Sequence, residues 1–495
     1  MPELSQRRRL LVLAICCMSL LIVGMDNTIV NVGLPTIRTD LHASLPDLQW
    51  TIDAYTVVLA SLLMLAGSTA DRIGRRRVFQ TGLTVFAVGS LLCSLAPSLG
   101  WLVAFRALQA VGGSMLNPVA MSIITNVFTE PRERARAIGI WGGVVGLSLA
   151  LGPIVGGLLI DAVGWRSIFW INVPIGLVAL VLTGCFVPES RADRPRRPDP
   201  IGQLLVIMVL AGLTFGIIES PRAGWLSAQT VLALVIAGAA LIALVCYEPR
   251  RTDPLLDLRF FRSVPFSGAA VTAVCAFGAF AGFLFLTTLY LQAVRGLSPL
   301  AAGVCLLPVA AMTLIFSPVS GRLVGAAGPR LPLLAAGALL AGGAVLLVPS
   351  SDHESYLRLI VGYLVFAAGF GLVNAPITNT AVSGMPLAQA GVAAAIASTS
   401  RQVGAALGVA VVGTVLATGV SGSLHSDFVA ASQAGWWIIA GCGVAVFVLA
   451  VITTSRPALR TAARAAELIE RQSSPELAGV AAHVDAPGDQ RKLHR

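Results

Sequence analysis

Asp26 is an acidic residue inside an otherwise apolar run, and its carboxyl could hold a proton or a cation. Between Leu10 and Leu34 it is the only charged side chain. At 1.5 Å per helical residue, it lies about 25 Å beyond Arg9, inside a hydrocarbon layer roughly 30 Å thick. A carboxyl at that depth is typical of an ion or substrate pathway. The alternative is that Asp26 reaches the opposite interface and is solvated there.

Arg106 is the basic residue that could balance this acid. In the segment FRALQAVGGS, Arg106, Gln109 and Gly113 recur at i, i+3 and i+7, so they share one face of a helix. If that helix enters the bilayer near Leu99, Arg106 lies roughly 8 to 10 Å below the surface. Asp26, counted from the other side, reaches a similar depth. The two charges are therefore expected to pair, and a change in their separation could switch the protonation of the acid.

Further polar residues lie close to Asp26 in the sequence. Asn27, Asn31 and Pro35 recur every four residues and form one polar stripe, which on a membrane helix faces protein or water. Asp53 lies three residues past Trp50, hence near an interface. It could bind cationic substrates, or it could be a solvated acid that favours the dipole of its helix.

The composition predicts an integral membrane protein. Of the 495 residues, 56% are hydrophobic and 12% are charged, and the mean hydropathy is +0.83. Lys492 is the only lysine, so the chain lacks the lysine of a phosphate-binding loop, and ATP hydrolysis is not expected. The eight cysteines lie in or beside apolar segments without metal-ligand spacing. We therefore expect no metal, no cofactor other than a proton gradient, and no enzymatic activity.

Fourteen apolar segments are long enough to cross a bilayer. They are residues 10–34, 50–70, 78–98, 101–126, 137–160, 167–187, 201–218, 229–247, 265–291, 300–320, 331–349, 357–380, 393–418 and 435–454. An even number places both termini on one side of the membrane. Of the basic residues, 27 lie in the terminal segments and the loops on that side, against five in the opposite loops. Both termini are therefore expected to be cytoplasmic.

The segments divide into six, two and six. The predicted domains are an N-terminal six-helix bundle (1–187), a linker with two extra transmembrane helices (188–264), a C-terminal six-helix bundle (265–455) and a partly disordered cytoplasmic tail (456–495). An internal repeat supports two similar halves, because GSTADRIGRRR at 67–77 is matched by GRLVGAAGPR at 321–330. In the second copy Gly325 replaces Asp71.

With these motifs in view, the chain resembles the major facilitator superfamily. Within it, the chain is similar to the fourteen-span drug:proton antiporters, which include quaternary-ammonium and methylenomycin exporters. The motifs that carry the resemblance are MDNTIVNVGLP at 25–35, WTIDAYTVVLAS at 50–61, GSTADRIGRRR at 67–77, FRALQAVGGS at 105–114, GGVVGLSLALGPIVGG at 142–157 and GWRSIFWINVPIG at 164–176. The resemblance implies an all-α major facilitator fold of 14 transmembrane helices in two pseudo-symmetric bundles.

The resemblance also implies roles for particular residues. Proton coupling would involve Asp26 and Arg106, while Asp53, Asn27, Asn31 and Gln109 would bind substrate. A conformational latch would involve Gly67, Asp71, Arg72, Gly74, Arg75 and Arg76, with Asp71 at the positive end of the third helix. The antiporter motif of the fifth helix would comprise Gly146, Gly152, Pro153, Gly156 and Gly157. Its glycine stripe lets another helix approach closely, although ordinary packing would explain the glycines equally well.

The second half is distinguished by missing acids. Its spans contain no Asp or Glu, so coupling is expected in the first half. Arg401 is the only charge in those spans, and we expect it to extend toward the cytoplasm or to bind lipid. Substrate contacts there would come from Asn374, Thr378 and Asn379, although polar contacts between helices look the same in sequence.

The sequence therefore predicts a proton-coupled efflux transporter for hydrophobic, possibly cationic, drugs or antibiotics. Its expected partners are a small-molecule drug, protons and the lipid bilayer, with no nucleic acid. It is expected to act as a monomer in the inner (plasma) membrane. Two alternatives stay open: a carrier or uncoupled facilitator of the same fold for a metabolite, lipid or siderophore, and a membrane sensor of drugs.

Overall fold

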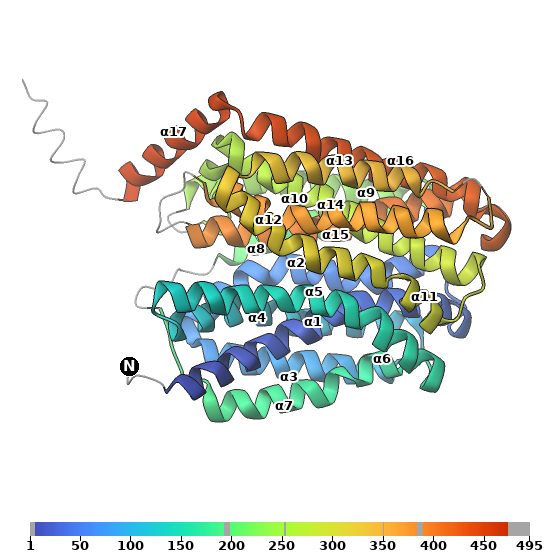
Figure 1. The fold of residues 1–495 in the computed structure, drawn as a ribbon, viewed down its shortest axis with the longest axis horizontal. Helices are drawn as coiled ribbons and strands as arrows, with labels where there is room; N and C mark the ends of the chain where they lie inside the picture. The colour runs from blue at the N-terminus through green and yellow to red at the C-terminus, as the bar shows by residue number, and fades with distance from the viewer. Residues whose placement is uncertain (1–4, 193–198, 252–253, 350, 384–389, 474–495) are drawn as a thin grey trace, which may run out of the picture.

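The computed structural model describes residues 5–192, 199–251, 254–349, 351–383 and 390–473. Within these ranges, the regular structure consists of helices (Figure 1). The first group comprises α1 (Gln6–Asp40), α2 (Leu45–Ile73), α3 (Arg75–Ser94), α4 (Leu99–Val127), α5 (Pro131–Val163), α6 (Ser167–Trp170) and α7 (Asn172–Phe186). The second comprises α8 (Pro200–Ala223) and α9 (Ala228–Tyr247), followed by the short 3-10 helices η1 (Glu248–Arg250) and η2 (Leu258–Arg262).

The third group begins with α10 (Val264–Leu289), which ends in one π-helical turn, η3 (Tyr290–Val294). It continues with α11 (Pro299–Cys305), α12 (Leu307–Ala327), α13 (Arg330–Leu346), α14 (Tyr356–Val382), α15 (Ala390–Gly419), α16 (Leu424–Thr453) and α17 (Arg456–Ser473). All fourteen predicted segments fall on helices. Thirteen spans in the described residues are long and apolar enough to cross a bilayer, and α13, with 17 residues, is shorter. The protein is therefore a multi-pass membrane protein.

The first and third groups form two bundles that repeat the same helix pairings. In the first, α1 packs along α5, α3 along α4, and α2 along α4. In the third, α10 packs along α15, α13 along α14, and α12 along α14. Gly74 and Gly328, which precede α3 and α13, both have positive φ angles, of 128° and 79°. The sequence repeat thus corresponds to equivalent turns in two similar bundles.

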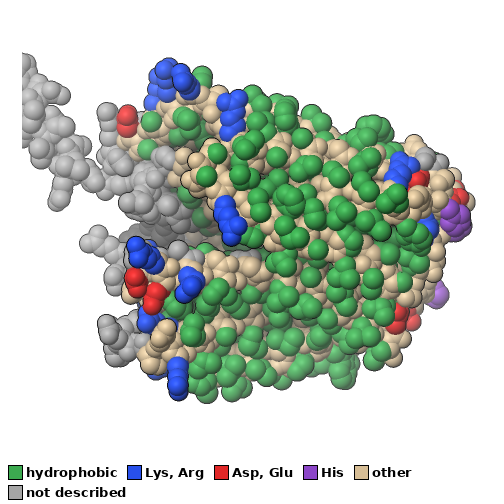
Figure 2. Space-filling view, viewed as in Figure 1, with side chains coloured by type: hydrophobic (Ala, Val, Ile, Leu, Met, Phe, Trp, Pro, Cys, Tyr) green, Lys and Arg blue, Asp and Glu red, His purple; other side chains and the backbone are tan. Residues whose placement is uncertain are grey.

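The N-terminus and α17 lie at the same end of the molecule, which we call the terminal end, and the opposite end is the far end (Figure 1). Apolar side chains cover the long sides of the molecule, while charged side chains gather at the two ends (Figure 2). This distribution fits a protein whose long sides face lipid. The 17-residue α13 is about 26 Å long, close to the thickness of the hydrocarbon layer.

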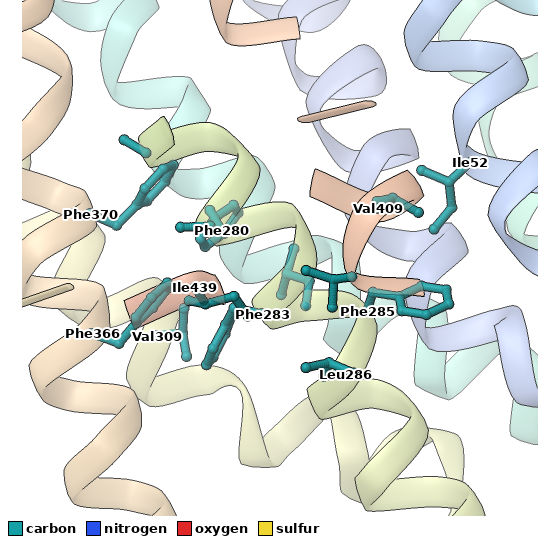
Figure 3. Close-up of a cluster of buried hydrophobic side chains, with 14 of the residues drawn as sticks. Ile52, Phe280, Phe283, Phe285, Leu286, Val309, Phe366, Phe370, Val409 and Ile439 are labelled. Atoms are coloured by element: carbon teal, nitrogen blue, oxygen red, sulfur yellow. The ribbon is translucent and has the colours of Figure 1, made fainter. Parts of the chain in front are cut away.

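Aromatic side chains fill the interior of the C-terminal bundle between α10 and α14 (Figure 3). The rings of Phe280 and Phe370 stack with centroids 4.0 Å apart, and those of Phe283 and Phe366 with centroids 4.5 Å apart. Beside them, α10 and α15 cross so closely that a Cβ on Gly408 would lie 2.2 Å from the carbonyl oxygen of Gly278. This packing makes the bundle a rigid apolar body.

The two bundles are joined at the far end. Gln49 of α2 donates hydrogen bonds to the carbonyl oxygens of Val409 and Ala410 on α15. On the other side of the seam, Gln292 donates to the carbonyl oxygen of Val32, 2.9 Å away. In the described part of the chain, the hydrogen bonds between the bundles lie in this far half, whereas at the terminal end the surface is indented between the bundles (Figure 2). The described conformation is closed at the far end.

The extra helices α8 and α9 lie beside the seam between α2 and α15. Gln203 of α8 donates to the carbonyl oxygen of Ser61 on α2, at 2.6 Å. From α15, Thr414 donates to the carbonyl oxygen of Ile217 on α8. Because α8 bonds to a helix of each bundle, it lines one side of the contact between them.

Candidate functional site

Asp26 and Arg106 form an ion pair in the interior of the N-terminal bundle. Nη1 of Arg106 lies 2.5 Å from Oδ2 of Asp26, and the two residues are 1% and 0% exposed. The burial of Asp26 and its pairing with Arg106 agree with the depths counted from the sequence, and the solvated alternative is wrong. Asp26 lies about 30 Å along α1 from Gln6, and Arg106 lies about 10 Å along α4 from Leu99. The pair is therefore closer to the far end.

Two amide side chains complete the ligands of this carboxylate. Gln109 donates from Nε2 to Oδ1 of Asp26 at 2.9 Å and accepts from Nη1 of Arg106 at 2.8 Å. Asn172, at the start of α7, donates to the same Oδ1 at 3.0 Å. Both amides also donate to Oγ of Ser90 on α3. We refer to these five residues, Asp26, Ser90, Arg106, Gln109 and Asn172, as the carboxylate cluster.

Gln109 and Asn172 changed their meaning between sequence and structure. Gln109 was predicted to bind substrate, but both ends of its amide are occupied and it is fully buried. It therefore supports the ion pair in the conformation described. Asn172 was not predicted as a site residue, although it lies within GWRSIFWINVPIG, one of the motifs of the resemblance. A buried polar residue in an apolar segment was the signal that could have identified it.

The position of the guanidinium is also fixed by α2. Nε of Arg106 donates to the carbonyl oxygen of Thr51, and its Cζ lies 4.2 Å from the centre of the Tyr55 ring. A buried ion pair is tolerated only when further hydrogen bonds replace lost water, and the carboxylate cluster supplies them. Four helices, α1, α2, α4 and α7, contribute to holding this one charge pair. A relative shift of α1 and α4 would separate the charges and leave the acid to take up a proton.

Asp53 lies elsewhere from where the sequence predicted. It was expected near an interface, but it is 0% exposed. The reason is that α2 begins at Leu45, where Ser44 and Asp47 form a capping box, so Asp53 lies about 12 Å inside the helix. Its Oδ1 accepts from Thr56 at 3.2 Å, and its Oδ2 has no hydrogen-bond partner among the described residues. A solvated acid at a helix start is therefore wrong.

The other predicted substrate residues fall into two separate groups. On α1, Asn31 is buried and donates to the carbonyl oxygen of Asn27, which is half-buried. On α14, Asn374 and Thr378 are half-buried and Asn379 is exposed. Among the described residues, no hydrogen bond joins the α1 group to the α14 group. The structure does not gather all five at one point.

The predicted latch residues surround the start of α3, but a different acid occupies its N-terminus. Asp71 pairs with Arg75, with Nη2 to Oδ1 at 2.9 Å. The backbone N–H of Arg76 donates instead to Glu189, and Gly74 leaves room for that carboxylate, since a Cβ there would lie 2.6 Å from Oε1 of Glu189. Placing Asp71 at the helix N-terminus was therefore wrong, because the chain after α7 returns and supplies Glu189.

The remaining latch residues have simpler surroundings. Arg76 donates to the carbonyl oxygen of Gly184 on α7, Arg72 is exposed, and Gly67 lies across from Pro118 of α4. These contacts lie within the N-terminal bundle.

The antiporter motif of α5 lies where helices approach most closely. Toward α1, a Cβ on Gly152 would overlap Thr28, and one on Gly156 would lie 2.5 Å from Ile29. Toward the other bundle, a Cβ on Gly157 would lie 2.5 Å from Cα of Leu300 on α11. The predicted close approach is present, and it includes the contact between the bundles.

Two further contacts extend this seam along α5. The carbonyl oxygen of Pro153 lies 2.3 Å from where a Cβ on Gly303 of α11 would be, and a Cβ on Gly146 would lie 3.0 Å from Leu314 of α12. The backbone N–H of Leu300 donates to Asp161 at 3.2 Å. One face of α5 thus packs within its own bundle and the other touches the opposite bundle.

Comparison with known proteins gives a consistent result. The family described as Major Facilitator Superfamily matches residues 16–409. The chain is 39% identical over 419 residues to the multidrug resistance protein Stp of Mycobacterium tuberculosis, covering 85% of this chain and 78% of that protein. It is also 39% identical over 402 residues to the tetracenomycin C resistance and export protein of Streptomyces glaucescens, covering 81% and 74% of the two chains.

A solved structure has the same fold. The crystal structure of a bacterial homologue of the human lysosomal transporter Spinster, in an inward-facing and unoccupied conformation, matches with a TM-score of 0.64. The match covers 93% of this chain and 99% of that one at 17% sequence identity, so it supports the fold alone.

Proposed function

Because the chain belongs to the major facilitator superfamily, we propose that it exports drugs or antibiotics across the plasma membrane in exchange for protons. The relatives named above support export of small molecules. The carboxylate cluster is the single observation that supports coupling, since a buried acid with a movable counter-charge can bind and release a proton.

The cycle would be alternating access between two bundles, residues 1–187 and 265–455, with the linker 188–264 and its two extra helices beside the seam. The excess of arginines at the terminal end favours a cytoplasmic location for both termini. The conformation closed at the far end would then be the one that loads substrate from the cytoplasm. Opening would separate α5 from α11 and α2 from α15, which form the far-end contacts between the bundles.

Exchange requires that the proton and the substrate disfavour each other's bound state. In the state described, Asp26 is ionised against Arg106 and accepts three hydrogen bonds from the side chains of Arg106, Gln109 and Asn172. Movement of α4 relative to α1 on opening would weaken that pair, and a proton from outside would replace the cation. Return to the far-closed state would restore the pair and release the proton inside. Monomeric action is proposed too, because one chain contains both bundles.

Proteoliposomes with an imposed pH gradient test this function. We expect lipophilic drugs to move against their concentration gradient while the pH gradient lasts, and to stop when a protonophore collapses it. Drug flux that runs only downhill and ignores the gradient would instead indicate a facilitator. Saturable drug binding without any flux, in protein that is monodisperse, would indicate a sensor and would contradict the proposal.

A further inference from the structure

Arg401 is a cation inside the C-terminal bundle without an acidic partner among the described residues. It lies about 16 Å along α15 from Ala390, near the middle of that 30-residue helix. It forms none of the ion pairs between described residues. The helices α10, α12, α13, α14 and α15 contain no Asp or Glu. The charge therefore has no balancing carboxylate on the helices of its own bundle core.

The contacts of Arg401 place it between helices. Its Nη2 donates to Oγ1 of Thr378 on α14 at 2.5 Å, and its Cζ lies 5.9 Å from the centre of the Phe277 ring on α10. Its Nε is fully buried and has no hydrogen-bond partner among the described residues. The predicted extension to the cytoplasm or to lipid does not describe these contacts, because the guanidinium is turned toward α14.

A second unused polar atom lies on the same helix as Thr378. Asn374 is one turn earlier, its carbonyl oxygen accepts from Oγ1 of Thr378, and its own Oδ1 is buried without a hydrogen-bond partner among the described residues. Buried polar atoms are normally paired, so two unpaired ones in adjacent positions indicate a place where another molecule supplies the partner. Arg401 and Asn374 belong to helices that touch through α14 and α15.

The end of α14 explains why the cation is stable when this place is empty. Thr378 lies four residues before the last residue of α14, Val382. The last turn of a helix carries a partial negative charge of about half an electron, which favours a nearby cation. A partial charge does not complete the hydrogen bonding of a guanidinium, which offers five N–H donors in a plane.

From these contacts we infer that Arg401, Thr378, Asn374 and Phe277 form a subsite for an acidic group of the exported molecule. This inference rests on the proposed export function and adds a substrate class to it. A carboxylate, or an ionised phenol or enol, would accept from the guanidinium, while the amide of Asn374 and the ring of Phe277 would contact the adjoining polar and aromatic parts. The acidic group would balance the charge that the bundle leaves unbalanced.

The test uses matched pairs of compounds and purified, monodisperse protein. Nalidixic acid and two other lipophilic carboxylic acids are each compared with their ethyl esters, by equilibrium binding and by flux in proteoliposomes. The native protein is expected to bind the acids about tenfold or more tightly than the esters, because a charge-assisted contact is absent from the ester. Arg401→Gln is expected to abolish this preference while binding the esters normally.

Two variants keep the comparison interpretable. Arg401→Lys retains the charge without the planar donor set, so it should keep part of the preference. Arg330→Gln removes an exposed arginine at the start of α13 and should behave as the native protein. If Arg401→Gln retains the native ratio of acid to ester affinity, or if the native protein prefers none of the three acids, the subsite is refuted.

The same experiment separates other causes. If inorganic phosphate or phosphatidylglycerol displaces the bound acids from the native protein but not the esters, the site belongs to an anion or a lipid headgroup, and the substrate assignment is wrong. If esters are exported but no acid preference exists, only the subsite fails. If neither acids nor esters move in proteoliposomes, the export function fails with it.

Discussion

Gly157 provides the most specific test of the far-end closure. A Cβ at this position would lie 2.5 Å from Cα of Leu300 and 2.7 Å from the carbonyl oxygen of Pro299, both backbone atoms of the opposite bundle. Carbon atoms pack best at about 3.5 to 4.0 Å, so Gly157→Ala requires the bundles to move apart by about 1 Å. Because backbone atoms cannot rotate away, the strain falls on the contact between the bundles.

The expected size of this effect follows from the cost of overpacking. Inserting a methyl group into a well-packed contact costs about 1 to 3 kcal/mol. Since the contact exists only while the far end is closed, Gly157→Ala should shift the equilibrium toward the far-open state by about 5- to 150-fold. The fold of each bundle should be unaffected.

Distances between spin labels measure this shift. In protein with its eight cysteines replaced, labels at Val163 and Leu357, exposed residues at the far end of each bundle, report the separation of the bundles. The native protein should give mainly the short distance, and Gly157→Ala a larger population at a longer one. Gly143→Ala is the matched control, because a Cβ on Gly143 meets nothing within 4 Å. An unchanged distance distribution in Gly157→Ala, or an equal change in Gly143→Ala, would refute the reasoning.

Three further changes have distinct expected results. Gln49→Leu removes the amide that bonds α2 to Val409 and Ala410, and should weaken far-end closure by about 1 kcal/mol, measured with the same labels. Asn172→Ala removes a donor to the buried carboxylate, which should cost about 1.5 to 3 kcal/mol of cluster stability and reduce substrate-driven proton flux more than substrate binding. Arg222→Ala breaks a part-exposed ion pair with Asp47 and should change transport rate and thermal stability little, about 1 kcal/mol or less; a severe loss would show that α8 has a larger role.

The sequence was sufficient for the helices and for the main charge pair. Long apolar runs are set by bilayer thickness, and counting residues from the flanking charges gave the depths of Asp26 and Arg106. Depth does not define rotation or neighbours, so the amides that complete the carboxylate cluster were not identified together. Asn172 is 146 residues from Asp26, and only the fold brings them to 3.0 Å.

The same limit explains the errors. Asp53 was placed too near the surface because the start of its helix was assigned to the apolar run, while the capping box at Ser44 and Asp47 extends α2 outward. Glu189 was missed because its contact with the start of α3 depends on how the chain returns after α7. Arg401 was expected to leave the bundle because its partner Thr378 lies on a different helix.

Substrate-driven proton movement through Asp26 tests the central proposal most directly. Energised inverted vesicles with native protein or Asp26→Asn are given lipophilic drugs, and the pH gradient is followed, with drug binding by both proteins measured in parallel. The proposal predicts that a drug discharges the gradient in native vesicles and not in Asp26→Asn vesicles, although the variant remains folded. Equal discharge by both proteins would contradict coupling through Asp26.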